Sequence, residues 1–305
     1  MPAPTDPHDK LFRALLDDPA RAGAFLRDHL PDAVRDQLAD DPAITPVDGT
    51  FVDDALRQHQ TDRLFSAKLK DGRRALLYAL LEHKAEPDAA TPLQLLRYVV
   101  RIWERDADGA ANRLRALPPV IPLVIYHGRA PWSVPTALSA MIDAPAAMGP
   151  WLPDFRYEVR DLGRMADGEL ARDTKLRVGL GALKYAKRDG GLAMLGPLLS
   201  EARDDAAFLE LLAWYALAAY GEPKERVREI FIGAASTRGE EAVMNALEEA
   251  EVKGEAAVLL RLIERKFGRP AMDAHRARVE SADAATLLTW SERILTAERV
   301  EDLFA

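Results

Sequence analysis

The sequence predicts an α/β fold followed by a mostly helical C-terminal third. Two short apolar segments, residues 74–84 and 117–126, have the length expected of buried strands. Between them, residues 91–105 repeat their apolar side chains at the helical period. After residue 167 the pattern is helical almost throughout. We therefore expect a mixed sheet flanked by helices, with further helices beyond it.

The first part of the chain is expected to form a helical cap ahead of the sheet. Asp6 and Pro7 are typical of a capping residue followed by proline at the first helical position. The pattern predicts helices over residues 7–17, 20–30 and 32–39, and a first strand within residues 44–52.

A hairpin is expected next, with Asp62 at its start and an Asp-Gly turn at residues 71–72. A two-residue loop there would pair Asp62 with Leu81 and separate it from the face of Glu82. A three-residue loop, residues 71–73, would pair Asp62 with Glu82 on one face. Three-residue hairpin loops with glycine near the left-handed position are common. We therefore expect the longer loop or an equivalent bulge.

Charged side chains gather where this hairpin ends. Glu82 and Lys84 share a strand face, roughly 7 Å apart along the chain. With Asp62 opposite, two carboxylates would suit a hard cation such as Mg²⁺, which prefers oxygen ligands. Lys84 would then position a water molecule and offset charge at an attacked phosphate. An ordinary salt bridge at a sheet edge would use the same residues and stays an alternative.

The helix over residues 91–105 opens at Thr91 and Pro92 and has one basic side. Such a stripe, next to a metal site, suits a phosphate backbone. A solvated helix face is the alternative, although three arginines in register make it less plain. At 100° per residue the basic side is expected to carry Gln94, Arg97, Tyr98, Arg101 and Arg105.

Together the order of Asp62, Glu82, Lys84 and the arginine helix resembles the PD-(D/E)xK nuclease core. Several segments are also similar to the Rpn (recombination-promoting nuclease) / putative transposase family. The resemblance implies a restriction-endonuclease-like PD-(D/E)xK core and a metal-dependent DNA endonuclease linked to recombination, mobile elements or defence. The similar segments are residues 8–16, 24–31, 51–66, 80–88, 95–105 and 117–132.

The resemblance assigns roles to individual residues of this chain. Asp62, Glu82 and Lys84 match the catalytic positions, and Gln94 matches a polar position in the following helix. Asp9, in the first helix, is a further candidate metal ligand beside Asp62 and Glu82. Mg²⁺ or Mn²⁺ is the implied cofactor and DNA the implied substrate. Many relatives have Gln at the position of Lys84, and the lysine present here favours activity.

Composition limits the function classes. The net charge of −8 repels nucleic acid in bulk, so weak, salt-sensitive DNA binding centred on the arginine helix is expected. The absence of cysteine excludes disulfides, thiolate metal sites and a cysteine nucleophile. No apolar window reaches the length of a membrane span, and no apolar signal region opens the chain. A cytoplasmic protein is therefore expected.

The histidines are expected to have structural rather than catalytic or metal-binding roles. His127 ends the strand of residues 117–126, where a structural role is favoured over a ligand or base because no second histidine stands at ligand spacing. His83 points to the face opposite Glu82.

The remaining chain is divided by its turn signals. A strand is expected over residues 155–162, followed by helices over 170–187, 192–199, 206–219, 224–234 and 240–251. We expect a nuclease domain over residues 1–190, a helical extension over 191–252 and a small helical domain over 253–305. The last is expected to dock on the core or to form a homodimer, because so small a helical segment has difficulty burying itself.

Two other functions stay open at this point. An inherited nuclease fold without catalysis would bind nucleic acid or protein, with the helical third as its functional part. An RNase would use the same chemistry, so DNA is expected from the resemblance alone.

Overall fold

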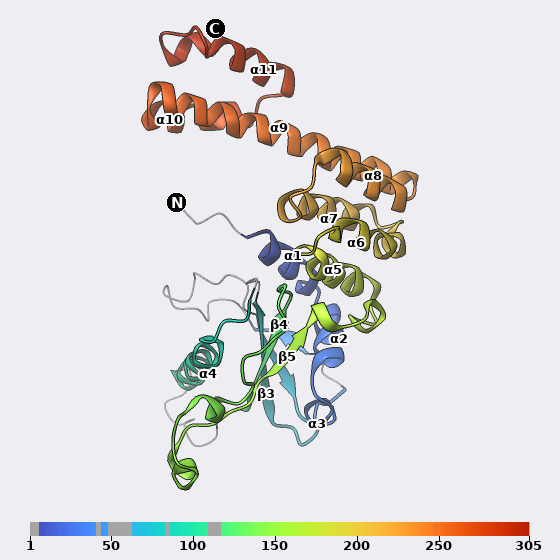
Figure 1. Cartoon of the computed structure of the whole chain (residues 1–305), viewed down its shortest axis with the longest axis vertical. Coiled ribbons are helices and arrows are strands. Elements are labelled where there is room, and N and C mark those ends of the chain that lie inside the picture. The colour runs from blue at the N-terminus through green and yellow to red at the C-terminus, as the bar shows by residue number, and fades with distance from the viewer. Residues whose placement is uncertain (1–5, 41–43, 48–62, 83–85, 109–116, 305) are drawn as a thin grey trace.

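The computed structural model describes residues 6–40, 44–47, 63–82, 86–108 and 117–304 (Figure 1). The predicted class, a mixed sheet with helices on both sides and a helical C-terminal third, is confirmed. The strands are β1 (Thr45–Pro46), β2 (Arg63–Lys68), β3 (Arg74–Glu82), β4 (Val120–Tyr126) and β5 (Glu158–Asp161). The helices are α1 (Pro7–Leu16), α2 (Pro19–His29), α3 (Asp32–Arg35), α4 (Thr91–Asp108), α5 (Thr174–Tyr185), α6 (Gly191–Leu199), α7 (Ala206–Ala219), α8 (Lys224–Ala234), α9 (Thr237–Phe267), α10 (Arg269–Glu280) and α11 (Ala284–Arg293).

Within the described residues the sheet has five strands in the order β1-β2-β3-β4-β5. The first three are antiparallel neighbours, whereas β3, β4 and β5 run parallel. Helix α4 connects β3 to β4, which is the crossover that a parallel pair requires. The apolar runs of β3 and β4 are those of strands covered on both faces.

The hairpin between β2 and β3 has a three-residue loop, but not the expected one. The amide of Leu69 donates to the carbonyl of Arg73 at 2.7 Å, so the loop is residues 70–72. Gly72 closes it with φ +88°, the left-handed conformation that glycine adopts without strain. The expectation of residues 71–73 is therefore wrong by one position, because an Asp-Gly pair locates the glycine without fixing where the turn begins.

The same difference moves the register. Arg63 pairs with Ala79, whereas the expected loop would have paired it with Leu81. Because side chains alternate between faces with a period of two residues, this shift leaves the described residues of β2 on their expected faces. Asp62 itself lies outside the described residues.

Each face of the sheet has its own apolar layer. Phe65, Leu77 and Leu123 pack into a core with residues of α1, α2 and α5. On the other face Tyr78 and Val124 belong to a second core with α4. Figure 1 shows α4 on one side of the sheet and α2 on the other.

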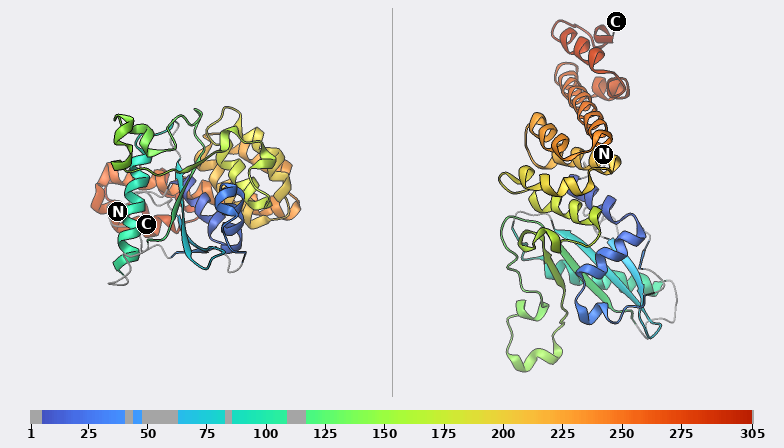
Figure 2. Two further views of the ribbon diagram at one scale, coloured as in Figure 1. Left: turned by 90° about the horizontal axis from the view of Figure 1, so that it is seen from below. Right: turned by 90° about the vertical axis from the view of Figure 1, so that its right-hand side faces the viewer.

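The helical extension shares the first of these cores. Leu11 and Leu15 of α1 join Leu180 of α5, Leu212 of α7 and Leu247 of α9 in one cluster. Helices α5 to α9 stack away from the sheet, with α10 and α11 at the far end (Figures 1 and 2). The proposed boundary at residue 190 therefore separates segments that fold around one core.

The boundary at residue 252 falls within one continuous helix. The expected break after residue 251 is wrong, since α9 runs from Thr237 to Phe267. The two ends of α9 nevertheless pack in different hydrophobic cores. Leu247 packs in the core that includes the sheet, whereas Ala256 packs in a third core with α10 and α11.

Other expected bounds need smaller corrections. The helix over residues 32–39 is the single turn α3, and the helix expected from residue 170 begins at Thr174, where Asp173 accepts a hydrogen bond from Leu176 at 2.9 Å. Of the first strand expected in residues 44–52, the described part is β1. No helix in the described part of the chain is long and apolar enough to cross a bilayer.

The turn from α5 to α6 yields a stability prediction. A Cβ at Gly191 would lie 2.0 Å from the carbonyl oxygen of Tyr185, a main-chain atom that cannot rotate away. Gly191→Ala should therefore lower the free energy of unfolding by about 1–3 kcal/mol. Urea unfolding followed by circular dichroism measures it.

Gly196, in the same helix, is the matched control. Its nearest neighbour to a built Cβ is Cγ2 of Ile230 at 3.7 Å, so Gly196→Ala should keep or raise stability. Equal unfolding midpoints for Gly191→Ala and the wild type would contradict the close approach of α5 and α6.

Candidate functional site

The parallel strands end level with one another. Glu82, the last residue of β3, pairs with Tyr126 of β4, and Tyr126 pairs with Asp161 of β5. In open α/β sheets ligands bind outside the carboxyl ends of the strands. The predicted site therefore begins at the edge of the sheet where such sites are found.

The predicted catalytic residues are described only in part. The backbone of Glu82 is described but its side chain is not, and Asp62 and Lys84 lie outside the described residues, as does His83. Their roles remain predictions. The described neighbourhood consists of what surrounds the end of β3.

The first turn of α1 lies at this edge. The ring of His8 packs against that of His127, with centroids 4.8 Å apart. His127 directly follows β4 and is 1% exposed. Its Nδ1 lies 3.1 Å from the carbonyl oxygen of Leu183 in α5 and donates a hydrogen bond to it. The expected structural role of His127 agrees with these contacts, which fasten β4 to α1 and α5.

Asp9 is carried to the same edge by this contact. It follows His8 in the first turn of α1 and is 8% exposed. Asp6 begins the helix, because its carboxylate accepts a hydrogen bond from the amide of His8 at 2.8 Å. The Asp-Pro signal in the sequence thus fixes where α1 starts, and the start of α1 fixes the position of Asp9.

A tyrosine from the helical extension completes the cluster. The hydroxyl of Tyr215, in α7, lies 2.8 Å from Nδ1 of His8, and the two rings meet edge to face. Tyr215 is 3% exposed. Burial, with smaller contributions from Tyr220 and Asp6, raises the pKa of Tyr215 well above its ordinary value, so the phenol stays protonated.

Asp161 lies level with Glu82 but is already engaged. One of its carboxylate oxygens accepts from the amide of Trp132 at 3.0 Å, and the other accepts from the amide of Gly163 at 3.1 Å. These bonds hold the segment after β4 and start a short helical turn (Leu162–Arg164). Asp161 is therefore a structural carboxylate.

The predicted basic side of α4 is exposed in part. Arg97 and Arg101 are exposed, and Arg105 is half-buried. Arg101 lies 3.7 Å from Glu104, an exposed pair that contributes little.

Tyr98 is a correction to the expected stripe. It is 4% exposed and its ring packs against Tyr78 of β3, with centroids 5.2 Å apart. Gln94 is half-buried, and its amide donates to the hydroxyl of Tyr98 at 3.2 Å. Tyr98 therefore belongs to the core between α4 and the sheet. Its hydroxyl, through the hydrogen bond, holds the side chain of Gln94.

Among the described residues no three His, Asp or Glu side chains come together in a way that could hold a metal ion. Of the predicted ligands, the side chains of Asp62 and Glu82 fall outside this set. The donor chemistry of the three carboxylates, Asp9 included, is that of a hard cation.

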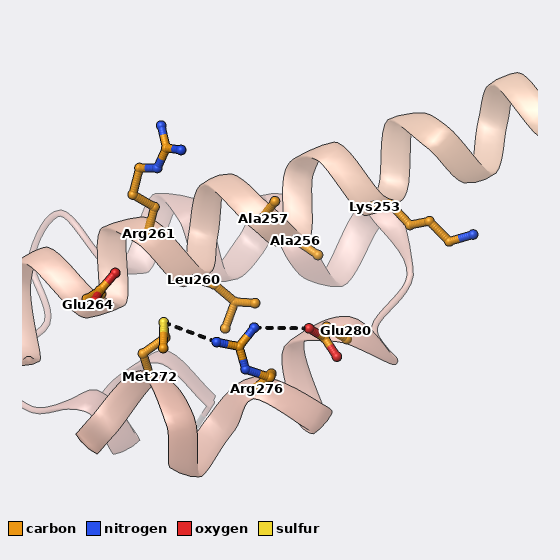
Figure 3. Close-up of a pocket in the computed structure, with 9 residues that line it drawn as sticks. All are labelled: Lys253, Ala256, Ala257, Leu260, Arg261, Glu264, Met272, Arg276 and Glu280. Carbon is orange, nitrogen blue, oxygen red and sulfur yellow. Dashed lines mark hydrogen bonds and ion pairs between the residues drawn. The ribbon is translucent and has the colours of Figure 1, made fainter. Parts of the chain in front are cut away.

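A groove in the C-terminal part is a weaker candidate for the functional site than the end of β3. It has a volume of about 520 Å³ and opens between α9 and α10 (Figure 3). Leu260, Ala256 and Met272 are among its lining residues, and Arg276 lies 3.4 Å from Glu280. The groove belongs to the third core cluster, apart from the sheet, and its charged groups are of both signs.

A family model matches the part of the chain that forms the sheet and its helices. A model of the family described as putative transposases, YhgA-like, matches residues 6–210. The chain belongs to this family. The match covers the sheet and its helices, and it ends within α7, five positions before Tyr215.

Curated relatives are named after nuclease activity. Recombination-promoting nuclease RpnD of Escherichia coli O157:H7 is 34% identical over 131 residues, 42% of this chain and 49% of that protein. Recombination-promoting nuclease RpnC of Escherichia coli strain K12 is 32% identical over 131 residues, 43% of this chain and 42% of the relative. The inactive recombination-promoting nuclease-like protein RpnE of the same strain is 30% identical over 124 residues, 41% and 40% of the two chains.

The matched stretches span less than half the length of these relatives. No solved structure matches the chain at a significant level. The sequence comparison thus supports a nuclease family, while the PD-(D/E)xK assignment stays a prediction from the order of residues.

Sequence reasoning missed part of the cluster at the sheet edge. His8 stood in a segment recognised for family resemblance, but nothing in the sequence tied it to His127. Tyr215 lies 207 positions from its partner, and no local pattern links them.

Proposed function

We propose that this protein is a metal-dependent DNA endonuclease that hydrolyses phosphodiester bonds. One observation carries the proposal: β3 ends at Glu82, level with Tyr126, and the contact between His8 and His127 brings the first turn of α1 to the same edge. The elements that carry Glu82 and Asp9 thus meet at one end of the sheet, and the chain belongs to a nuclease-like family.

In this proposal Asp62, Glu82 and Asp9 hold Mg²⁺ or Mn²⁺. Carboxylate oxygens are the donors that these ions prefer. The ion would polarise the phosphodiester and lower the pKa of a bound water. Alternation along β3 assigns Leu76, Tyr78 and Leu80 to the α4 face, and we propose that Glu82 continues this series.

Lys84 and Gln94 would act on the attacked phosphate and on the water. The ammonium of Lys84 would orient the attacking water and offset the charge that develops on the phosphate. Gln94 would bind from the start of α4. Its support is the hydrogen bond to Tyr98, which is fixed in the core against Tyr78.

The arginines of α4 would hold the DNA backbone. Arg97, Arg101 and Arg105 follow Gln94 along one side of the helix, where cations meet phosphates in succession. The net charge of −8 makes this a local attraction against a repulsive background. Binding is therefore expected to be weak and strongly dependent on salt.

The names of the relatives suggest a setting in recombination, mobile elements or defence. RpnD and RpnC are named recombination-promoting nucleases. Cleavage of DNA would be sufficient for that role, and no residue of this chain indicates strand transfer. RNA cleavage would use the same site.

A second candidate is a non-catalytic binding module on the same fold. The observation that favours it is the name of RpnE, an inactive nuclease-like protein at 30% identity. The set of Asp62, Glu82 and Lys84 in this chain favours the enzyme.

The first test is plasmid cleavage with Mg²⁺ or Mn²⁺ beside EDTA. The wild type should cut with metal and not with EDTA. Glu82→Ala should abolish cleavage, and Lys84→Ala should lower the rate by about 10²–10³-fold, the usual cost of removing one group that stabilises the transition state.

Glu248→Ala, at an exposed position of α9, is the control and should cut like the wild type. Thermal melts should show all variants folded. Cleavage by Glu82→Ala at the wild-type rate would move the chemistry elsewhere. A wild type that is inert with both metals at every salt concentration would favour the binding module.

A second prediction concerns the arginine stripe. In EDTA, Arg97→Ala and Arg101→Ala should each weaken DNA binding and reduce the slope of log K against log salt by about 1, because each removes one phosphate contact. Fluorescence anisotropy over a salt series measures both quantities.

Arg228→Ala, at an exposed position of α8, is the matched control, since it removes the same charge from another helix. Its salt slope should equal that of the wild type. If all three variants lose the same slope, net charge rather than the α4 surface governs binding.

A further inference from the structure

The cluster at the sheet edge reaches beyond the part of the chain that defines the family. The family match ends at residue 210, and Tyr215 lies on α7 beyond it. Its hydroxyl nevertheless contacts His8, the neighbour of Asp9. A helix of the extension therefore touches the turn that carries a proposed metal ligand.

The ring of His8 has partners on two sides. The hydroxyl of Tyr215 and Nδ1 of His8 share one hydrogen bond. The neighbouring His127 is itself held, because its Nδ1 donates a hydrogen bond to the carbonyl oxygen of Leu183. The ring of His8 is thus fixed on one side by Tyr215 and on the other by His127.

Position along α1 links this ring to the site. His8 and Asp9 are consecutive residues in the first helical turn, where Asp6 already holds the amide of His8. A rotation of this turn would move His8 and Asp9 together. Removal of a residue that orients a metal ligand through a hydrogen bond typically weakens metal binding by about 10–100-fold.

We propose that Tyr215 is a positioning residue: through its hydrogen bond to His8 it holds the first turn of α1, and with it Asp9, in place to bind a divalent cation at the carboxyl end of β3. The inference rests on the proposed nuclease function. It also gives the helical extension a role in the site, since α7 supplies the hydroxyl.

Tyr220 provides a matched control. It stands at the end of the same helix, its ring meets that of Tyr215 edge to face, and its hydroxyl donates to the carbonyl of Ala182 at 2.8 Å. Loss of this hydroxyl removes one hydrogen bond to α5 and leaves α1 untouched. Tyr215→Phe and Tyr220→Phe should therefore cost similar stability and differ in metal binding.

The test is a Mn²⁺ titration of the full chain, followed by electron paramagnetic resonance of the free ion. Tyr215→Phe and His8→Leu should weaken Mn²⁺ binding about tenfold, at the lower end of the range for outer groups. His8→Asn, whose side chain keeps a hydrogen-bonding group near the place of Nδ1, should bind more tightly than His8→Leu. Tyr220→Phe should bind like the wild type.

Cleavage supplies a second readout. For Tyr215→Phe the Mn²⁺ concentration at half-maximal rate should rise by the same factor, excess Mn²⁺ should restore the rate, and KM for DNA should not change. A purely structural loss would not be restored by metal.

The outcomes separate this inference from the function on which it rests. Mn²⁺ binding that is lost in Glu82→Ala but unchanged in Tyr215→Phe overturns the positioning role alone. Equal weakening by Tyr220→Phe overturns it as well, because packing would then explain both. A wild type that binds no Mn²⁺, or Glu82→Ala that binds as the wild type does, overturns the metal site and the inference with it.

Discussion

The parallel pairing of β3 with β4 is the constraint on which the rest of the molecule depends. Its ladder runs without interruption from Leu76 opposite Val120 to Glu82 opposite Tyr126. Because both strands are covered on both faces, a slip of one residue would move the side chains of one strand into the layer that is packed for the other face. The ladder therefore fixes the height of Glu82 relative to His127, and through His127 its height relative to α1.

Helix α1 transmits this constraint to the helical extension. One side of it packs on the sheet core, and its residues share that core with α5, α7 and α9. The helical extension is thus not an independent unit joined by a linker. The unit formed by α10, α11 and the end of α9 differs, because it has a core of its own. Its attachment through one continuous helix explains how a small helical segment stays folded, which burial alone makes difficult.

Local signals predicted most elements, and their failures have local causes. Proline and aspartate marked the start of α1, and the bounds of α7 and α8 followed from their turn residues. Gly254 lies just beyond the break expected after residue 251, and no proline stands near it. Helix formers around one glycine outweigh its cost of about 1 kcal/mol, so α9 continues.

Tyr98 shows how a periodic pattern can mislead at the site. At 100° per residue it lies about 20° from Arg105 and about 60° from Arg101, which suggested an exposed face. It is also three positions after Leu95 and four before Ile102, both buried, and this spacing defines the face that packs on the sheet. An aromatic ring with a polar tip fits either face, so only packing decides. The contact between His8 and Tyr215 had no such local signal, because tertiary packing alone brings 207 positions together.

The central claim is that the carboxylates of Asp62, Glu82 and Asp9 meet one divalent cation at the carboxyl end of β3. The most direct measurement is the anomalous scattering of Mn²⁺ in crystals of the full chain. The account predicts a peak within about 2–2.5 Å of a carboxylate oxygen of Glu82, near the first turn of α1. A well-ordered edge of the sheet without a peak, or a peak confined to another part of the molecule, would contradict the account.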